Sequence, residues 1–348
     1  MLEGLEGVNK VEPKVKKMSA GREKFWVGKN VFVTGATGVI GSHLAIALNS
    51  AGADVTILKR DHDKDSLLET SGEIDKVNVA WGELEDFRAL ERVLVQYEID
   101  TVFHLGAQPI VRKSKIIPRK TFESNIQGTW NLLDACRIVG YESDRLQRIV
   151  VASSDKAYGS SKKLPYTEET PLQGSFPYDV SKSCCDLISQ SYYKTYHLPV
   201  AVARLGNVFG QGDLNFNRIV PGTIKSILLG EDVIIRTDGS PVREYLFVRD
   251  AADAYLSLAQ QLQEKKLAGE AFNFSSGNKM TVLEIVNKII SLTGSKQKPK
   301  VLAEVKDEIA EQYISTEKAE RILGWKAKTE IDAALLETIE WYKKFFKK

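Results

Sequence analysis

The 348-residue sequence predicts an α/β protein, a doubly wound parallel sheet with a smaller, discontinuous C-terminal lobe. From Lys29 to Asn207, short apolar runs alternate with amphipathic helical segments, which is typical of parallel strands joined by right-handed helical crossovers. The runs are apolar throughout rather than at every second position, so both faces of the sheet are expected to be buried. After Asn207 this alternation loosens, which indicates the second lobe.

The elements follow from this pattern in chain order. The expected strands cover residues 30–35, 55–58, 77–82, 101–107, 148–154 and 200–207. The expected helices between them cover residues 42–52, 87–97, 121–140 and 178–196. Gly52 has the place of a helix-ending glycine.

The later part of the chain predicts a helix at 223–230, a short strand at 233–236, and a strand, helix and strand at 243–248, 250–262 and 271–276 that rejoin the main sheet. A helix over 281–294 begins with a capping box, Thr281 followed by Glu284, and ends at Gly294. A last amphipathic helix starts near Ile331. The first residues, rich in Lys, Glu and Gly, show no periodicity and predict a loosely docked extension.

Composition excludes several classes of protein. Hydrophobic residues make up 43% and charged residues 27%, as in ordinary globular chains, and the formal net charge of +2 lacks the basic excess of a nucleic-acid binder. Apolar runs are too short for a membrane span, and the N-terminus lacks the apolar core of a secretory signal. Three cysteines, Cys136, Cys184 and Cys185, form neither a disulfide framework nor a metal-ligand spacing. We therefore expect a soluble cytoplasmic protein without a metal site.

A glycine-rich turn, G-x-x-G-x-x-G, follows the first strand and opens the first helix. Gly35 permits a tight turn, Gly38 lets backbone amides approach a pyrophosphate, and Gly41 lets the helix pack close to the strand. The residues expected to bind the cofactor here are Gly35, Thr37, Gly38, Val39, Ile40 and Gly41.

The second strand ends in Lys59-Arg60-Asp61, where an acidic residue would hold a ribose diol. Asp61 could bind the 2′-hydroxyl of NAD, whereas Arg60 could bind the 2′-phosphate of NADP. A solvated basic loop explains the same residues as well. NAD is the expected cofactor, and NADP stays open.

Tyr178 and Lys182 form a Y-x-x-x-K motif at the start of a helix, so their side chains share one helical face. A fixed cation beside a phenol favours the phenolate and lowers its pKa, so this pair could take the proton of an alcohol while hydride leaves for nicotinamide. In isolation, a surface tyrosine and a solvated lysine would be the simpler interpretation. The preceding phosphate turn and a strand ending in Ser153-Ser154 favour the catalytic one.

Together these motifs resemble an extended short-chain dehydrogenase/reductase of the nucleotide-sugar epimerase/dehydratase kind, and most closely the CDP-glucose 4,6-dehydratase branch. The similarity runs from about Gly28 to the C-terminus. Its carriers are TGATGVIG, FHLGAQP, SNIQGTWNLLDA, VVASSDKAYG, PYDVSK, RLGNVFGQGD, VREYLFVRDAADAY and KAERILGW. The resemblance implies a Rossmann-like sheet.

The segment Ser154-Asp155-Lys156 distinguishes the possible reactions. In the family, a Ser or Thr here binds the sugar O4 beside the tyrosine, and dehydratases follow it with two acid/base residues, Asp-Lys in the CDP-glucose branch. The resemblance therefore implies Lys156 as the base at C5 and Asp155 as the acid at the C6 hydroxyl. An Asp–Lys ion pair at a strand end is the plainer alternative.

The resemblance implies further binding residues. Leu105, Gly106 and Ala107 resemble the loop along the cofactor, and Glu83 with Leu84 occupies the place near adenine, where the family usually has Asp rather than Glu. The residues implied for the substrate are Gln108, Ser154, Asn207, Arg218 and Arg243. A bidentate guanidinium at Arg243 suits a diphosphate. His104 is expected to pack against the sheet.

These assignments divide the chain into an N-terminal extension (1–25), a dinucleotide-binding domain (26–207 and 246–275) and a substrate-binding lobe (208–245 and 276–348). In this family the helices near 120–140 and 178–197 form a four-helix dimer interface. The apolar faces here permit a homodimer, although packing against the protein's own core would give the same pattern; their residues are Ile126, Trp130, Leu133, Leu187, Ile188 and Tyr192.

The sequence thus predicts a nucleotide-sugar 4,6-dehydratase that makes a 4-keto-6-deoxyhexose. A 4-epimerase that returns the hydride to a transient 4-ketone is the alternative, and Asp155-Lys156 favours the dehydratase. A non-catalytic NAD(P)-sensing protein is disfavoured, because it would not need Ser154, Tyr178 and Lys182.

Overall fold

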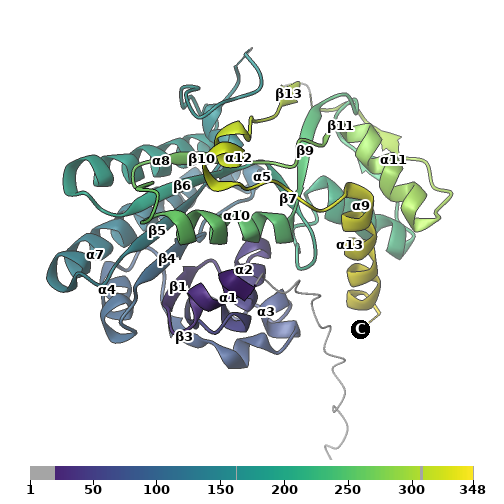
Figure 1. Ribbon diagram of the computed structural model, residues 1–348. Coiled ribbons are helices and arrows are strands. Elements are labelled where there is room, and N and C mark those ends of the chain that lie inside the picture. The colour runs from purple at the N-terminus through teal and green to yellow at the C-terminus, as the bar shows by residue number, and fades with distance from the viewer. Residues whose placement is uncertain (1–19, 162, 306–308, 348) are drawn as a thin grey trace, which may run out of the picture.

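The computed structural model describes residues 20–161, 163–305 and 309–347, and its centre is a seven-stranded parallel sheet (Figure 1). This confirms the predicted doubly wound sheet. The strand order changes direction between β1 and β4, the place where such sheets bind their ligands. Across the sheet the strands are β10 (Ala271–Phe274), β6 (Val200–Leu205), β5 (Arg148–Ser154), β4 (Thr101–His104), β1 (Asn30–Thr34), β2 (Asp54–Lys59) and β3 (Asn78–Trp81).

Helices cover both faces of this sheet. Because neighbouring side chains of a strand point to opposite faces, Val31 and Val33 belong to one buried cluster and Phe32 to the other. Helices α2 (Val39–Ser50) and α10 (Val248–Gln261) pack on the first face. The second face carries α4 (Phe87–Gln96), α7 (Gly128–Ser143) and α8 (Pro177–Tyr196).

Short elements connect these layers. Residues 121–140, expected as one helix, are divided among α6, a π-helical turn and α7. The connecting elements are α3 (Leu67–Thr70), η1 (Glu73–Lys76), α5 (Val111–Ile116), α6 (Pro118–Phe122), the π-helical η2 (Glu123–Gln127) and η3 (Asp155–Tyr158).

The smaller lobe is built around its own sheet. Strand β9 (Val242–Phe247) pairs with β7 (Asn207–Phe209), β11 (Lys279–Thr281) and β13 (Glu311–Gln312). The prediction that residues 243–248 rejoin the main sheet is therefore wrong. An apolar run shows that a strand is buried but not which sheet it joins. Of the two strands predicted to rejoin the main sheet, at 243–248 and 271–276, only the second, β10, does so. The lobe's other elements are α9 (Ile219–Leu229), β8 (Ile234–Ile235), α11 (Val282–Thr293), β12 (Lys300–Val301) and α13 (Ile331–Phe345).

Helix α11 begins as its sequence predicts. Thr281 accepts a hydrogen bond from the Glu284 backbone N–H at 3.1 Å, and the Thr281 backbone N–H donates to Glu284 Oε2 at 2.7 Å. This reciprocal pair is the expected capping box. The helix ends at Gly294, whose φ of +70° is a left-handed conformation that favours glycine.

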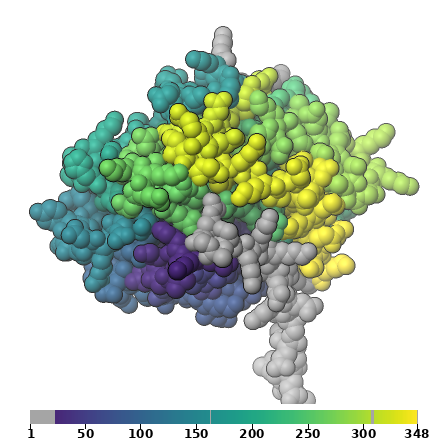
Figure 2. Space-filling model, viewed as in Figure 1, coloured from purple at the N-terminus to yellow at the C-terminus, as the bar shows by residue number. Residues whose placement is uncertain are grey.

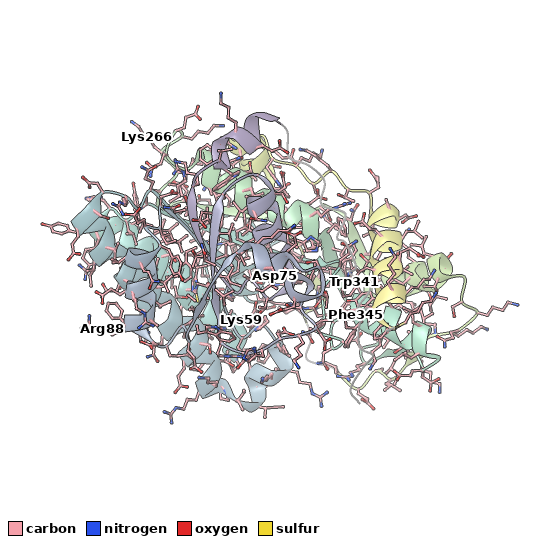
Figure 3. The ribbon with its side chains drawn as sticks, turned by 90° about the horizontal axis from the view of Figure 1, so that it is seen from below. Lys59, Asp75, Arg88, Lys266, Trp341 and Phe345 are labelled. Atoms are coloured by element: carbon pink, nitrogen blue, oxygen red, sulfur yellow. The ribbon has the colours of Figure 1, made fainter. Side chains whose placement is uncertain are left out.

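The C-terminal segment returns to the main sheet before it reaches the lobe. Helix α12 (Glu317–Leu323) packs on β10 and α10, and the Trp325 ring meets the Phe274 ring edge-on at 4.9 Å. Figure 2 shows this yellow segment lying against the green of α10. On α13, the Trp341 and Phe345 rings stack at 5.0 Å (Figure 3). Residues 276–348 are thus shared between the lobe and the main domain.

Residues 20–25, expected to belong to the extension, lie in helix α1 (Ala20–Trp26), while residues 1–19 lie outside the described part of the chain. Trp26 is fully buried, with its ring 6.0 Å from that of Phe103. The Gly28 backbone N–H also donates to the Gly52 carbonyl at 2.9 Å. One tryptophan therefore fixes this helix to the core, a signal too short to show as periodicity.

We expect Trp26→Ala to lower the free energy of unfolding by about 3–5 kcal/mol, because it leaves a cavity beneath the sheet. Urea unfolding followed by circular dichroism measures this change. Val27→Ala is the matched control, since Val27 is 65% exposed and its loss should change stability by less than about 0.5 kcal/mol. Equal effects of the two substitutions would show that α1 does not belong to the core.

Candidate functional site

The glycine-rich turn brings three backbone segments into direct contact at the end of β1. Gly35 has a φ of +74°, and a Cβ there would lie 2.7 Å from the Gly106 nitrogen. A Cβ at Gly41 would lie 2.1 Å from the Gly35 carbonyl oxygen. No side chain caps α2 at Gly38, so its first backbone N–H groups remain able to bind an anion. This geometry fits the pyrophosphate of a dinucleotide, with Thr37, Val39 and Ile40 in the same turn.

At the end of β2, three consecutive charged side chains differ in how deeply they are buried. Lys59 is buried, forms an ion pair with Glu69 and lies over the Trp81 ring. Arg60 and Asp61 are both exposed and pair with each other at 2.7 Å. The surface beside the phosphate turn therefore presents one carboxylate and one guanidinium.

The expected adenine and cofactor-loop residues form a second close contact. Leu84 packs beneath the loop after β4, since a Cβ at Gly106 would lie 2.9 Å from its Cδ1. Leu105 and Ala107 flank that glycine and are half-buried. Glu83 instead is exposed, with its carboxylate 3.8 Å from Lys120 Nζ.

The structure brings Ser154, Asp155 and Tyr178 together at the end of β5. Ser154 Oγ donates to Asp155 Oδ1 at 2.9 Å and accepts from the Lys156 backbone N–H at 3.2 Å. Tyr178 lies close enough to Ser154 and Asp155 for both to affect its pKa. Tyr178 is the second residue of α8, directly after Pro177, so the positive end of the helix dipole lies beside its phenol.

Burial raises the pKa of Tyr178 to about 12, against the smaller, lowering effect of the Arg218 charge. The prediction that the pKa of Tyr178 is lowered is therefore wrong for the protein groups alone. Lys182, one turn further along α8, is buried and donates from Nζ to the Ala152 carbonyl at 2.8 Å. Burial lowers the pKa of Lys182.

Lys156 is held by a residue that the sequence did not identify. Its Nζ donates to Gln312 Oε1, and Gln312 Nε2 donates to the Asp155 carbonyl at 3.1 Å. Gln312 lies on β13, far away in the sequence. Short, mixed-polarity strands such as β13 give no sequence signal for such a contact.

Two further carboxylates surround this group. Burial raises the pKa of Asp179, with a smaller lowering by Lys156 and a further raising by Asp155. Burial also raises the pKa of Glu244, which accepts from the Ile314 backbone N–H at 2.9 Å and feels the negative charge of Asp155. In the sequence, Asp179 and Glu244 could have been found only from their positions next to Tyr178 and Arg243.

The lobe supplies the residues expected at the substrate. Arg218 donates to both Asp213 carboxylate oxygens at 3.0 Å and lies close enough to Tyr178 to lower its pKa. Asn207 Nδ2 donates to the Glu244 carbonyl at 3.3 Å. Arg243 is buried and donates to the Ile309 carbonyl at 2.7 Å.

Gln108 is held by its own side of the molecule rather than by the lobe. Its backbone N–H donates to Asn125 Oδ1 at 2.7 Å, and its Nε2 donates to Thr121 Oγ1 at 3.1 Å. Asn125 in turn donates to Ser181 Oγ at 2.9 Å. These contacts tie the cofactor loop to the helix of Tyr178.

The remaining candidates are structural. His104 is buried between Thr34 and Thr129, with its ring nitrogens 2.8 Å and 3.1 Å from their hydroxyls. The three cysteines are unpaired thiols in helices α7 and α8. Within the described residues, no group of three or more His, Cys, Asp or Glu side chains is arranged to hold a metal, and no helix is long and apolar enough to cross a membrane.

Comparisons with known proteins identify a family for this chain. The profile of a family described as GDP-mannose 4,6-dehydratase matches residues 32–338. CDP-glucose 4,6-dehydratase of Salmonella typhimurium is 31% identical over 92% of this chain and 92% of its own length.

The similar solved structures include a dehydratase and an epimerase. The dTDP-glucose 4,6-dehydratase of Bacillus anthracis in complex with NAD superposes with a TM-score of 0.79 at 27% identity, covering 91% of this chain and 97% of that one. An epimerase of Methanothermobacter thermautotrophicus superposes with a TM-score of 0.86 at 27% identity, covering 94% and 96%.

We expect the free energy of unfolding to fall as the pH decreases from about 6.5 to about 4. Burial lowers the pKa of His104 to about 3 and that of His43 to about 4, so on acidification the unfolded chain binds these protons first. The loss is at most about 3 kcal/mol per histidine. Urea titrations across this pH range measure it, and the non-titrating His104→Gln variant should show a shallower slope. An unchanged slope in that variant would contradict the assignment to His104.

Proposed function

Because the chain belongs to the GDP-mannose 4,6-dehydratase family of extended short-chain dehydrogenases/reductases, we propose that it is a nucleotide-sugar 4,6-dehydratase. It converts an NDP-hexose into an NDP-4-keto-6-deoxyhexose by oxidation at C4, loss of water across C5 and C6, and return of the hydride to C6. NAD is the cofactor. When bound, it supplies the cationic nicotinamide ring that accepts and returns the hydride.

The observation that carries the proposal is the placement of Asp155 and Lys156 beside the Ser154–Tyr178 pair. In the proposed reaction Ser154 holds the sugar O4, and Tyr178, acting as its phenolate, takes the O4 proton. The resulting 4-ketone makes the C5 proton acidic, so an amine base and a carboxylic acid on the next two residues can expel water. An epimerase has no step that uses this second pair.

Each group has a defined proton to move. The Lys156 amine takes the C5 proton, the electron pair of that bond forms the C5–C6 double bond, and Asp155 protonates the departing C6 hydroxyl as water. Asp179 and Glu244 lie close to Asp155, and burial raises the pKa of both of these neighbouring carboxyls. Lys182, fixed on Ala152, lies on the helical face of Tyr178.

The binding roles follow the two-part architecture. We assign the cofactor to residues 26–207 and 246–275 and the nucleotide sugar to 208–245 and 276–348, with Arg218 and Arg243 as the cations for the diphosphate. Arg218 supports this assignment by its closeness to Tyr178. Gln108 and Asn207 complete the substrate set.

A 4-epimerase is the second candidate, because an epimerase also superposes over 94% of this chain. It would use Ser154 and Tyr178 in the same way and leave Asp155 and Lys156 as structural groups. The product distinguishes the two reactions.

We further propose that the protein works in the cytoplasm as a homodimer. Its unpaired thiols suit a reducing compartment. Helices α7 and α8 lie side by side at one end of the molecule and expose Trp130 (45%) and Leu187 (54%), which supports a four-helix interface with a second copy. Leu133, predicted for that face, is instead buried in the protein's own core.

We expect the purified protein with NAD to convert one of the CDP-, GDP-, UDP- or dTDP-hexoses into a product lighter by one water, detected by mass spectrometry. Tyr178→Phe removes the proton acceptor and should lower the rate by about 100- to 10,000-fold. Tyr141→Phe is the matched control, because Tyr141 is exposed on α7. A product of unchanged mass but altered stereochemistry would contradict the dehydratase and favour the epimerase.

Charges at the proposed interface should separate the two copies. We expect Trp130→Glu combined with Leu187→Glu to convert the dimer into a folded monomer, because both side chains are exposed in the single chain and buried only in the pair. Light scattering after size exclusion measures the mass. A monomeric wild-type protein, or a variant that stays dimeric, would rule out this interface.

A further inference from the structure

Gln312 is the point where the C-terminal part of the chain contacts the proposed reaction centre. Its side chain is fully buried, and both ends of its amide are used there: the oxygen accepts from Lys156 Nζ, and the nitrogen donates to the Asp155 carbonyl at 3.1 Å. One buried amide thus forms hydrogen bonds with the side chain of Lys156 and with the backbone of Asp155, and this fixes the relative position of the two residues.

The segment that carries Gln312 is anchored on two sides. In the register of the small sheet Gln312 pairs with Arg243 of β9. Two residues further along, the Ile314 backbone N–H donates to Glu244 at 2.9 Å, and Ile314 forms a β-bridge with Tyr166 of the main domain. The amide is therefore held by backbone pairing to both lobes, so it cannot follow a moving lysine.

We propose that Gln312 is a positioning residue for the dehydration step, holding the Lys156 amine and the Asp155 backbone in the arrangement that removes the C5 proton and expels water. This inference rests on the proposed 4,6-dehydratase function. Gln312 makes no contact with the sugar in this proposal and acts through Lys156.

The chemistry explains why an amide suits this place better than a carboxylate. A base at C5 must be a neutral amine when it acts, and a neutral amide oxygen orients the amine without adding negative charge. Charged groups already face Lys156: Asp155 on its own turn, Asp179 on α8 with Lys115 of α5 nearby, and Glu244 on β9 beside Asp155. A further carboxylate at 312 would stabilise the ammonium form and withhold the base.

The test separates the two halves of the reaction in the NAD-loaded enzyme. In a single turnover with whichever nucleotide-hexose the wild type dehydrates, reduced cofactor reports C4 oxidation and the mass of the product reports dehydration. Gln312→Met keeps the side-chain length and removes both hydrogen bonds. We expect reduced cofactor to form at the wild-type rate and accumulate, dehydration to slow by about 10- to 100-fold, and the substrate concentration that half-saturates the oxidation rate to stay unchanged.

A second variant changes charge rather than shape. Gln312→Glu keeps an acceptor for Lys156 but adds a negative charge, so the alkaline rise of the dehydration rate should move to higher pH by about one unit or more. Gln261→Met is the matched control, because Gln261 also links the C-terminal segment to the main domain, donating to the Leu323 carbonyl at 3.0 Å, away from the site.

The outcomes are distinct. Equal slowing of oxidation and dehydration in Gln312→Met, or unchanged rates, would overturn the positioning role, as would an unmoved pH profile in Gln312→Glu. Should Gln312→Met fail to fold, the near-isosteric Gln312→Glu decides alone. A wild type that dehydrates none of the CDP-, GDP-, UDP- and dTDP-hexoses overturns the proposed function itself, whatever the variants do.

Discussion

The arrangement of the site depends on how closely the backbone segments approach one another where the strand order reverses. Gly35 and Gly106 leave no room for a Cβ between β1 and β4, and Gly41 brings α2 onto the same turn. On the other side of β4, His104 at the end of the strand pairs with Val151 of β5. Strand β5 therefore runs three residues past its neighbour and carries Ser154 beyond the edge of the sheet.

This extension of β5 explains why the candidate site residues lie together at the end of one strand. Past Ser154 the chain forms a short 3-10 helix, and Tyr178 lies nearby in the first turn of α8. Oxidation and dehydration then have adjacent but separate groups: Tyr178 lies near Arg218 of the lobe, whereas Lys156 is bound by Gln312 of the small sheet. Both halves of the proposed reaction thus depend on residues of the lobe.

The sequence was most informative where one local pattern determines the outcome. The alternation of strands and helices, the glycine turn and the Thr281–Glu284 capping box each depend on neighbouring residues, and each appears in the structure as expected. Sheet membership of β9 and the burial of Trp26 depend on partners distant in the sequence, so no local pattern contained them. The sequence also predicted a lowered pKa for Tyr178, whereas burial raises it. The helical spacing between Tyr178 and Lys182 contains no information about burial.

The discontinuity of the small lobe has a consequence for synthesis on the ribosome. Once Phe274 has emerged, every strand of the main sheet has been made, yet β13 and α13 do not exist. Trp325, which covers Phe274, and Tyr342, whose hydroxyl donates to the Asp213 carbonyl, come later still. A nascent chain therefore completes its nucleotide-binding sheet before it can hold Lys156 in place, so the capacity to expel water is acquired last.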